Sequence, residues 1–150
     1  KRQDIGAPFR QPEWSALSLI EKPDFILKAH NDFIKAGADI ITTNSYAIVP
    51  FHIGEKKFNN SASDLLKLSG KIARDAASKT ERKIKVAGCI PPVFGSYNSN
   101  LFNYEKSIPI YKLFEKINAG AARDDWLGVR RSEASKEMLS TASVRIAGAI

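Results

Sequence analysis

Polar side chains gather where a short apolar run ends, in the stretch AGADIITTNSYAIVP. Ile40 and Ile41 are β-branched and typical of a buried strand, and Thr43, Asn44 and Tyr46 follow them closely. Hydroxyl and amide groups just beyond a parallel strand can bind a small polar ligand, because such sheets collect functional side chains at their carboxyl ends. The alternative is that Thr42 and Thr43 are ordinary strand residues and that Tyr46 packs beneath a loop.

Three other side chains belong to types that bind metals or act as bases. Cys89 is the single cysteine, which excludes an internal disulfide and a multi-cysteine zinc cluster within this chain. Its place after KVAG is typical of a small buried hydrophobe. His30 precedes the apolar run on a predicted helix, which favours a structural role. His52 follows the run in the loop VPFHIG and remains open as a base or ligand.

Helical and strand patterns alternate along the chain and would position these residues. Pro23 suits a first helical turn and Gly37 a C-terminal cap, while Ser61 with Asp64 three residues on predicts the start of a second helix. The predicted elements are a helix over 22–37, a strand over 38–44, a helix over 61–79, a strand over 83–89, a helix over 107–120, a strand over 124–129 and a helix over 132–142.

This alternation predicts an α/β fold with parallel strands joined by right-handed crossovers, either a barrel or a doubly wound sheet. Periodicity alone leaves both open. The sequence contains neither G-x-G-x-x-G nor G-x-x-x-x-G-K-[ST], so the usual signatures of a phosphate-binding nucleotide fold are missing.

Composition indicates one globular domain of 150 residues with a net charge of +7. The densest basic stretch, SKTERKIK over 78–85, contains Glu81 and no interleaved aromatic residue, so we expect a solvated link and no nucleic-acid partner. No apolar run approaches the roughly 18 residues of a membrane span, and the first residues lack a signal-peptide core. A cytoplasmic location without membrane association is therefore expected.

Three separated motifs carry a resemblance to a known family. PEWSA (12–16), HNDFIKAGADIITTNSY (30–46) and AGCIPPVFGSY (87–97) resemble the N-terminal half of the homocysteine S-methyltransferase family, which includes betaine-homocysteine methyltransferase. The resemblance is strong over 9–112 and weak over 118–150. It implies a partial (β/α)₈ TIM-type barrel, about strands 2 to 4 or 5 of 8, within a single incomplete homocysteine-binding domain.

The resemblance also implies a chemistry. The family transfers a methyl group to the homocysteine thiol to give methionine, with a donor such as S-methylmethionine, S-adenosylmethionine or a betaine. A thiol with a pKa of about 8.5 is mostly protonated at neutral pH, and the thiolate is the nucleophile. Zinc held by three cysteines supplies that thiolate in the family, because coordination deprotonates a thiol.

By this resemblance Thr43, Asn44 and Tyr46 bind substrate, with Tyr46 the best candidate for direct contact with homocysteine. Hydroxyl and amide groups suit the amino-acid end of that ligand.

The AGCIPPVFGSY segment resembles the loop that walls the pocket after the next strand. Pro91 and Pro92 stiffen its start and Gly95 permits a turn, after which Tyr97 follows. A plain turn is the alternative for this loop. Trp14, in the first motif, is expected to pack near the start of the barrel.

Departures from the family pattern limit what the chain can do. The family's initial Asp-Gly-Gly motif is absent, and Val129 and Arg130 follow DDWLG where the family usually has Glu-Thr, whose glutamate binds homocysteine. Zinc ligands are absent from this chain, and no catalytic residue is assigned to it. A partial barrel leaves strand edges unpaired, so a missing barrel half or an oligomer partner is expected.

Two functions remain open at this stage. The first is a fragment of a zinc-dependent homocysteine S-methyltransferase that is inactive by itself. The second is a catalytically inactive, truncated relative with only a binding or interaction role.

Overall fold

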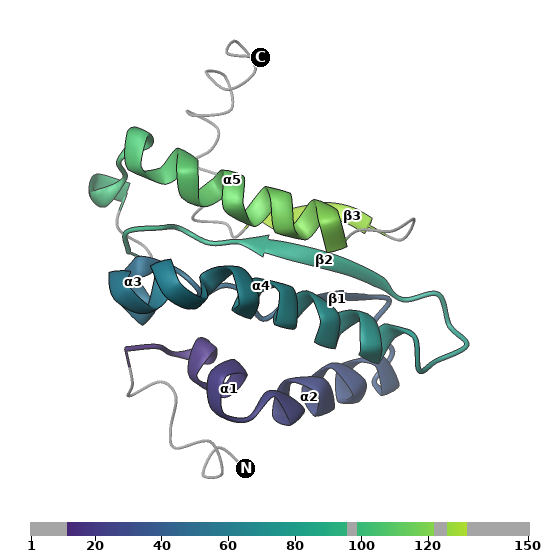
Figure 1. Cartoon of the computed structure of the whole chain (residues 1–150). Helices are drawn as coiled ribbons and strands as arrows, with labels where there is room; N and C mark the ends of the chain where they lie inside the picture. The colour runs from purple at the N-terminus through teal and green to yellow at the C-terminus, as the bar shows by residue number, and fades with distance from the viewer. Residues whose placement is uncertain (1–11, 96–98, 122–125, 132–150) are drawn as a thin grey trace.

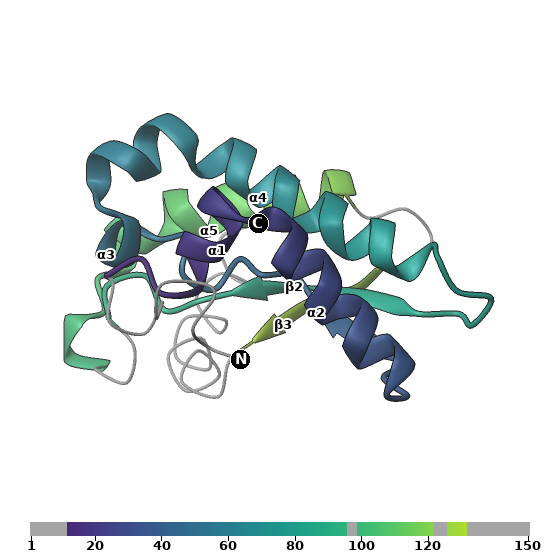
Figure 2. The same ribbon diagram turned by 90° about the horizontal axis from the view of Figure 1, so that it is seen from below.

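The computed structural model describes residues 12–95, 99–121 and 126–131. Its sheet contains three parallel strands in sequence order: β1 (Ile40–Thr42), β2 (Lys85–Ile90) and β3 (Trp126–Arg131). The helices are α1 (Ser15–Glu21), α2 (Pro23–Lys35), α3 (Pro50–Ile53), α4 (Glu55–Ala77) and α5 (Tyr104–Ala121), with a 3₁₀ turn η3 (Ser99–Leu101). The long helices α2, α4 and α5 lie on one face of the sheet, with α4 packed between the other two (Figures 1 and 2). The predicted α/β class with parallel strands is confirmed.

Helix α2 begins and ends where the sequence predicts. Pro23 occupies the first turn, where its missing N–H needs no partner. At the other end Gly37 has φ 102°, and the N–H of Ala38 donates to the carbonyl of Phe33 at 3.0 Å. Glycine adopts this left-handed conformation readily, so the helix ends here and the chain changes direction. Strand β1 starts three residues after Gly37.

Helix α4 begins earlier than predicted. It starts at Glu55, directly after Gly54 with φ 77°, so the prediction that Ser61 caps this helix is wrong. Phe58 and Ala62 are buried four residues apart and extend the apolar stripe of the helix toward its start. This burial outweighs the capping preference of Ser61, which lies inside the helix. Helices α1 and α3, of seven and four residues, were not predicted, because such short segments show no periodicity.

The two faces of the sheet differ in the part of the chain that the structure describes. Ile41 and its neighbour Val86 point toward the helices and are buried in one apolar cluster with Ile34. Ile40 belongs to the other face and is 49% exposed, beside the exposed Lys85. At the start of the strands, then, the face of Ile41 and Val86 is covered by helices and the face of Ile40 and Lys85 is exposed.

Two predicted elements fall near the C-terminus. The strand expected over 124–129 is observed as β3, Trp126–Arg131, parallel to β2. The helix expected over 132–142 lies outside the described residues. Among the helices that are described, none is long and apolar enough to cross a membrane.

Candidate functional site

Hydroxyl groups join the exits of β1 and β2 at the carboxyl edge of the sheet. The N–H of Thr43 donates to the carbonyl of Ala87 at 2.8 Å, which extends the strand ladder by one step. Beyond it the N–H of Cys89 donates to Thr43 Oγ1, and Ser45 Oγ donates to the Cys89 carbonyl, both at 3.2 Å. The two hydroxyls lie 3.0 Å apart. Side chains therefore take over the pairing where the backbone of the first strand turns away.

Burial makes this hydroxyl pair a firm connection. Thr43 is 4% exposed and Ser45 is 0% exposed. In a buried place each backbone group of Cys89 needs a partner, and these hydroxyls supply both. The Thr43 side chain thus has intramolecular partners, and its predicted contact with a substrate remains a prediction.

Asn44 lies between the two hydroxyls and points elsewhere. Its Nδ2 donates to the carbonyl of Ser15 at 3.1 Å, which connects the strand exit to the first turn of α1. Trp14, immediately before that helix, has φ 48°, a value that few residues other than glycine adopt. The half-buried Asn44 amide helps to hold this unusual turn against the carboxyl edge.

An aromatic cluster adjoins this turn and includes Tyr46. The ring of His52 lies 4.6 Å from that of Trp14, 5.0 Å from that of Phe51 and 6.5 Å from that of Tyr46. His52 Nδ1 lies 3.1 Å from the carbonyl of Pro12, to which a neutral imidazole can donate. Burial lowers the pKa of His52, although this carbonyl opposes the shift. A neutral His52 therefore anchors the segment that carries Trp14, which packs against the hydrophobic core.

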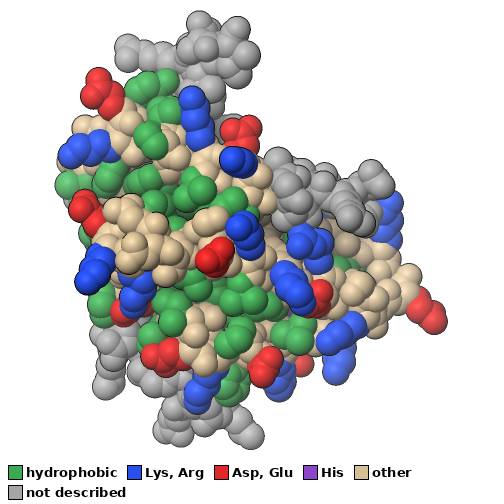
Figure 3. Space-filling view, in the orientation of Figure 1, with side chains coloured by type: hydrophobic (Ala, Val, Ile, Leu, Met, Phe, Trp, Pro, Cys, Tyr) green, Lys and Arg blue, Asp and Glu red, His purple; other side chains and the backbone are tan. Residues whose placement is uncertain are grey.

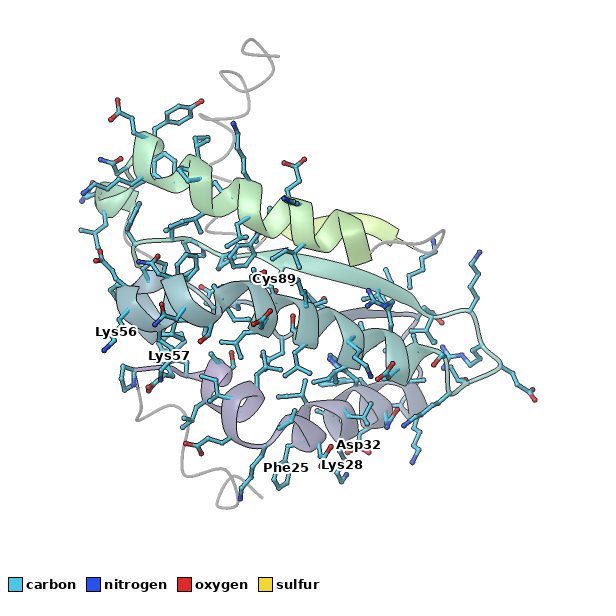
Figure 4. The ribbon with its side chains drawn as sticks, in the orientation of Figure 1. Phe25, Lys28, Asp32, Lys56, Lys57 and Cys89 are labelled. Carbon is cyan, nitrogen blue, oxygen red and sulfur yellow. The ribbon has the colours of Figure 1, made fainter. Side chains whose placement is uncertain are left out.

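An ion pair holds the same N-terminal segment from outside. Lys57, near the start of α4, donates to Glu13 Oε1 at 3.1 Å (Figure 4 labels Lys57). Hydrogen bonding to the backbone, and then to Lys57, lowers the pKa of Glu13. Because both side chains are partly exposed, this ion pair contributes little to the stability of the fold and mainly helps to position the N-terminal segment.

The loop after β2 meets the loop after β1. Pro91 and Pro92 are fully buried, and Gly95 has φ 149°. A Cβ at Gly95 would lie 3.0 Å from the Leu101 side chain and 3.8 Å from the ring of Phe51. Glycine is therefore required where the two loops approach. Tyr97, the other predicted residue of this loop, lies outside the described residues.

No metal site emerges from the described part of the chain. It contains no group of three or more His, Cys, Asp or Glu side chains placed to hold an ion. Cys89 is buried on β2, in agreement with its interpretation as a small hydrophobe (Figure 4). His30 is buried on α2, and burial lowers its pKa, as expected for a structural histidine.

The structure brings most of the predicted site residues to one edge of the sheet. Thr43, Asn44 and Tyr46 follow β1, and Pro91 and Gly95 follow β2, so both groups lie beyond carboxyl ends.

Sequence reasoning missed Ser45 and Phe51 at this edge. The spacing of Thr43 and Ser45, two residues apart, was the available signal for a shared face. The structure also places Val129, which pairs with Gly88 near the carboxyl end of β3. The position where this sequence differs from the family's usual Glu-Thr therefore lies at the same edge of the sheet.

Comparison with known proteins identifies the family. The family model described as Homocysteine S-methyltransferase matches residues 2–123. The chain belongs to this family. It is 34% identical over 104 residues to homocysteine S-methyltransferase 1 of Arabidopsis thaliana, which covers 64% of this chain and 32% of the relative. It is 39% identical over 75 residues to a selenocysteine methyltransferase of Astragalus bisulcatus, covering 49% and 22%.

A solved structure shares the fold. The metallated form of the homocysteine methyltransferase MmuM from Escherichia coli matches with a TM-score of 0.64 at 22% identity, over 89% of this chain and 53% of that chain. By sequence, this homocysteine S-methyltransferase family member spans about a third of the length of the relatives it matches (32% of the first).

Proposed function

We propose that this chain forms one side of the homocysteine-binding barrel of a zinc-dependent homocysteine S-methyltransferase. The reaction transfers a methyl group to the homocysteine thiol and gives methionine. The observation that carries this proposal is the convergence of Thr43, Asn44 and Tyr46 with the loop of Pro91 and Gly95 at the carboxyl edge, in a chain of this family.

The arrangement of elements supports the barrel. Strands that follow one another in sequence are neighbours in the sheet, and the long helices lie on one face, as in a barrel wall. A doubly wound sheet has helices on both faces. We assign β1 to β3 to strands 2 to 4 of a TIM-type barrel, with the face that includes Ile40, opposite the long helices, toward the interior.

Within this pocket wall Tyr46 is the residue proposed to contact homocysteine. Its ring is half-buried beside His52, and its hydroxyl can donate or accept a hydrogen bond. The Asn44 amide has a carbonyl oxygen and a second N–H besides its bond to Ser15, which suits the charged amino-acid end of homocysteine. The aromatic side chains of Trp14 and Phe51 provide apolar contacts for the ligand.

The residues of this chain do not fit the zinc site that the family implies. Three thiolates are needed, and the sequence has one cysteine, whose side chain is buried. We therefore propose that zinc and the completing half of the barrel come from outside residues 1–150, and that this chain alone is inactive. We also propose a cytoplasmic location, because a free thiol such as that of Cys89 suits a reducing compartment.

An inactive relative with only a binding role is the second candidate. It is favoured by Val129, which places an apolar residue at the edge where the family usually has glutamate. The ammonium of homocysteine would lack its carboxylate there.

Calorimetric titration of the purified chain with L-homocysteine under reducing conditions tests the pocket wall. Tyr46→Ala should weaken binding by about tenfold, the usual cost of one good hydrogen bond with its ring contact. Tyr104→Ala, at a 39% exposed tyrosine on α5, is the matched control and should leave the affinity unchanged. Equal affinities for all three proteins would contradict the proposed role of Tyr46.

Methionine formation is the companion measurement. With homocysteine, S-methylmethionine and zinc supplied, the chain alone should form no methionine and bind no stoichiometric zinc. Methyl transfer with one bound zinc per chain would overturn the proposal that the ligands lie elsewhere.

A further inference from the structure

An open groove lies at the opposite, amino edge of the sheet, between the C-terminal ends of α2 and α4. Its volume is about 450 Å³, within the range of small-molecule sites. Three cationic residues, Lys35, Lys79 and Arg82, line it together with the uncharged polar residues Asn31 and Thr80. The link from α4 to β2 closes one side. This groove is separate from the candidate homocysteine site, which lies beyond the other ends of the same strands.

The charged residues that line the groove are all cations, and one of them, Arg82, is paired with the carboxylate of Asp39. No carboxylate is among its lining residues, and Lys35 and Lys79 form no ion pair among the described residues. Elsewhere on the same two helices lysines do have acidic partners, for example Lys28 with Asp32 at 2.6 Å. Figure 3 shows several Lys and Arg side chains, with Asp and Glu side chains among them, over the C-terminal half of α4 and the link that follows it. The two groove lysines thus keep their ammonium donors available.

Arg82 removes the electrostatic objection to an anion at this place. A helix C-terminus carries partial negative charge, which would repel an anion. The Arg82 guanidinium donates to the carbonyls of Ile34, Gly37 and Ala38 at 3.0, 3.3 and 3.2 Å and pairs with Asp39. The carbonyls of Ile34, Gly37 and Ala38 at the end of α2 are therefore already bonded to a guanidinium, whose own charge Asp39 balances.

At the end of α4, carbonyls of the last turn accept hydrogen bonds from the backbone N–H groups that follow the helix. The N–H of Ser78 donates to the carbonyl of Arg74 at 2.9 Å, and the N–H of Lys79 donates to the carbonyl of Ala76 at 3.3 Å. Several of the last carbonyls at both helix ends that border the groove thus have partners. What faces a ligand is the pair of lysines, with Ile34 and Ala76 as an apolar floor.

We propose that this groove binds a phosphate-bearing small molecule. The phosphate lies between Lys35 and Lys79, with the Asn31 amide and the Thr80 hydroxyl as further donors, and the apolar part of the ligand packs on the floor. Lysine ammonium groups form charge-assisted hydrogen bonds with phosphate oxygens, which are stronger than neutral ones. This inference goes beyond the proposed methyl transfer and does not depend on it.

The test is a titration of the ¹⁵N-labelled full chain with inorganic phosphate and with pyrophosphate, against chloride at constant ionic strength. Saturable shifts at the amides of 31–35 and 79–82 are expected. The variant Lys35→Gln/Lys79→Gln should bind at least about tenfold more weakly, because two charge-assisted contacts are lost.

The control variant is Lys56→Gln/Lys116→Gln, which removes the same charge at exposed positions outside the groove. It should stay within about twofold of the parent protein, since distant surface charges are screened. Equal weakening in both variants, or no saturable shift in the parent, would overturn the proposal. So would a DNA duplex that binds more tightly than pyrophosphate and loses affinity equally in both variants, because this would indicate diffuse attraction to a nucleic-acid backbone.

Discussion

The two edges of the sheet are held by different kinds of interaction. At the carboxyl edge the neutral hydroxyls of Thr43 and Ser45 bond to the backbone of Cys89, and all three residues are buried. At the amino edge the charged Arg82, whose side chain is 44% exposed, bonds to the end of α2 and to the exposed Asp39. Each edge thus connects segments more than 40 residues apart in the sequence.

This difference indicates that the hydrogen bonds at the carboxyl edge contribute more to stability, whereas the amino edge presents charged groups to solvent. A buried N–H that loses its partner has no water to replace it, whereas an exposed group regains water at once. The carboxyl edge should therefore tolerate few changes at its hydroxyls. The amino edge should tolerate changes of sequence better and can present free charge to a ligand.

The largest expected effect is at the carboxyl edge. Thr43→Val keeps the shape of the side chain but removes the acceptor of the Cys89 N–H, which should lower the free energy of unfolding by about 2 kcal/mol. Thr80→Val is the matched change at the amino edge, where the hydroxyl accepts from the N–H of Arg82 in an exposed place. Urea unfolding should show a loss of no more than about 0.5 kcal/mol there. Equal losses would remove the distinction between the edges.

Removal of the guanidinium at the amino edge should have an intermediate effect. Arg82→Gln loses several bonds to carbonyls and the ion pair with Asp39, but water can replace them, so a loss of about 1 kcal/mol is expected. Lys112→Gln, at an exposed lysine on α5, should change the stability very little. Thermal and urea unfolding measure both variants, and a loss from Arg82→Gln as large as that from Thr43→Val would contradict the comparison.

The smallest effect concerns pH and vanishes near neutrality. Burial lowers the pKa of His30 and His52 below the unfolded value of about 6.5, so the unfolded chain binds protons first as the pH falls. Stability is then complete above about pH 7 and decreases as the pH falls through about 6.5. His52→Gln should flatten the dependence of the unfolding free energy on pH below about 6.5. An unchanged slope would show that burial of His52 does not govern it.

Local signals in the sequence predicted the elements well. Pro23 and Gly37 mark the ends of α2 because both act through their own backbone geometry. The start of α4 was predicted wrongly at Ser61, since the burial of Phe58 depends on tertiary packing that a capping pattern does not report.

The candidate site was predictable only in part. Thr43 and Tyr46 stood out because polar residues followed a buried strand. The hydrogen bonds of Ser45 to Cys89 and of Arg82 to Ile34 at the end of α2 span 44 and 48 residues, so no local sequence pattern predicts them. The amino-edge groove was missed for the same reason, because Lys35 at the end of α2 and Lys79 in the link after α4 are brought together only by the fold.

Mapping of L-homocysteine onto the ¹⁵N-labelled chain tests the central claim most directly. A binding wall at the carboxyl edge predicts saturable amide shifts at residues 43–46 and 93–95, and these shifts should weaken in Tyr46→Ala while the amides of 31–35 and 79–82 stay unchanged. Shifts confined to the amino edge, or shifts that Tyr46→Ala leaves intact, would contradict the assignment of the homocysteine pocket to the carboxyl edge.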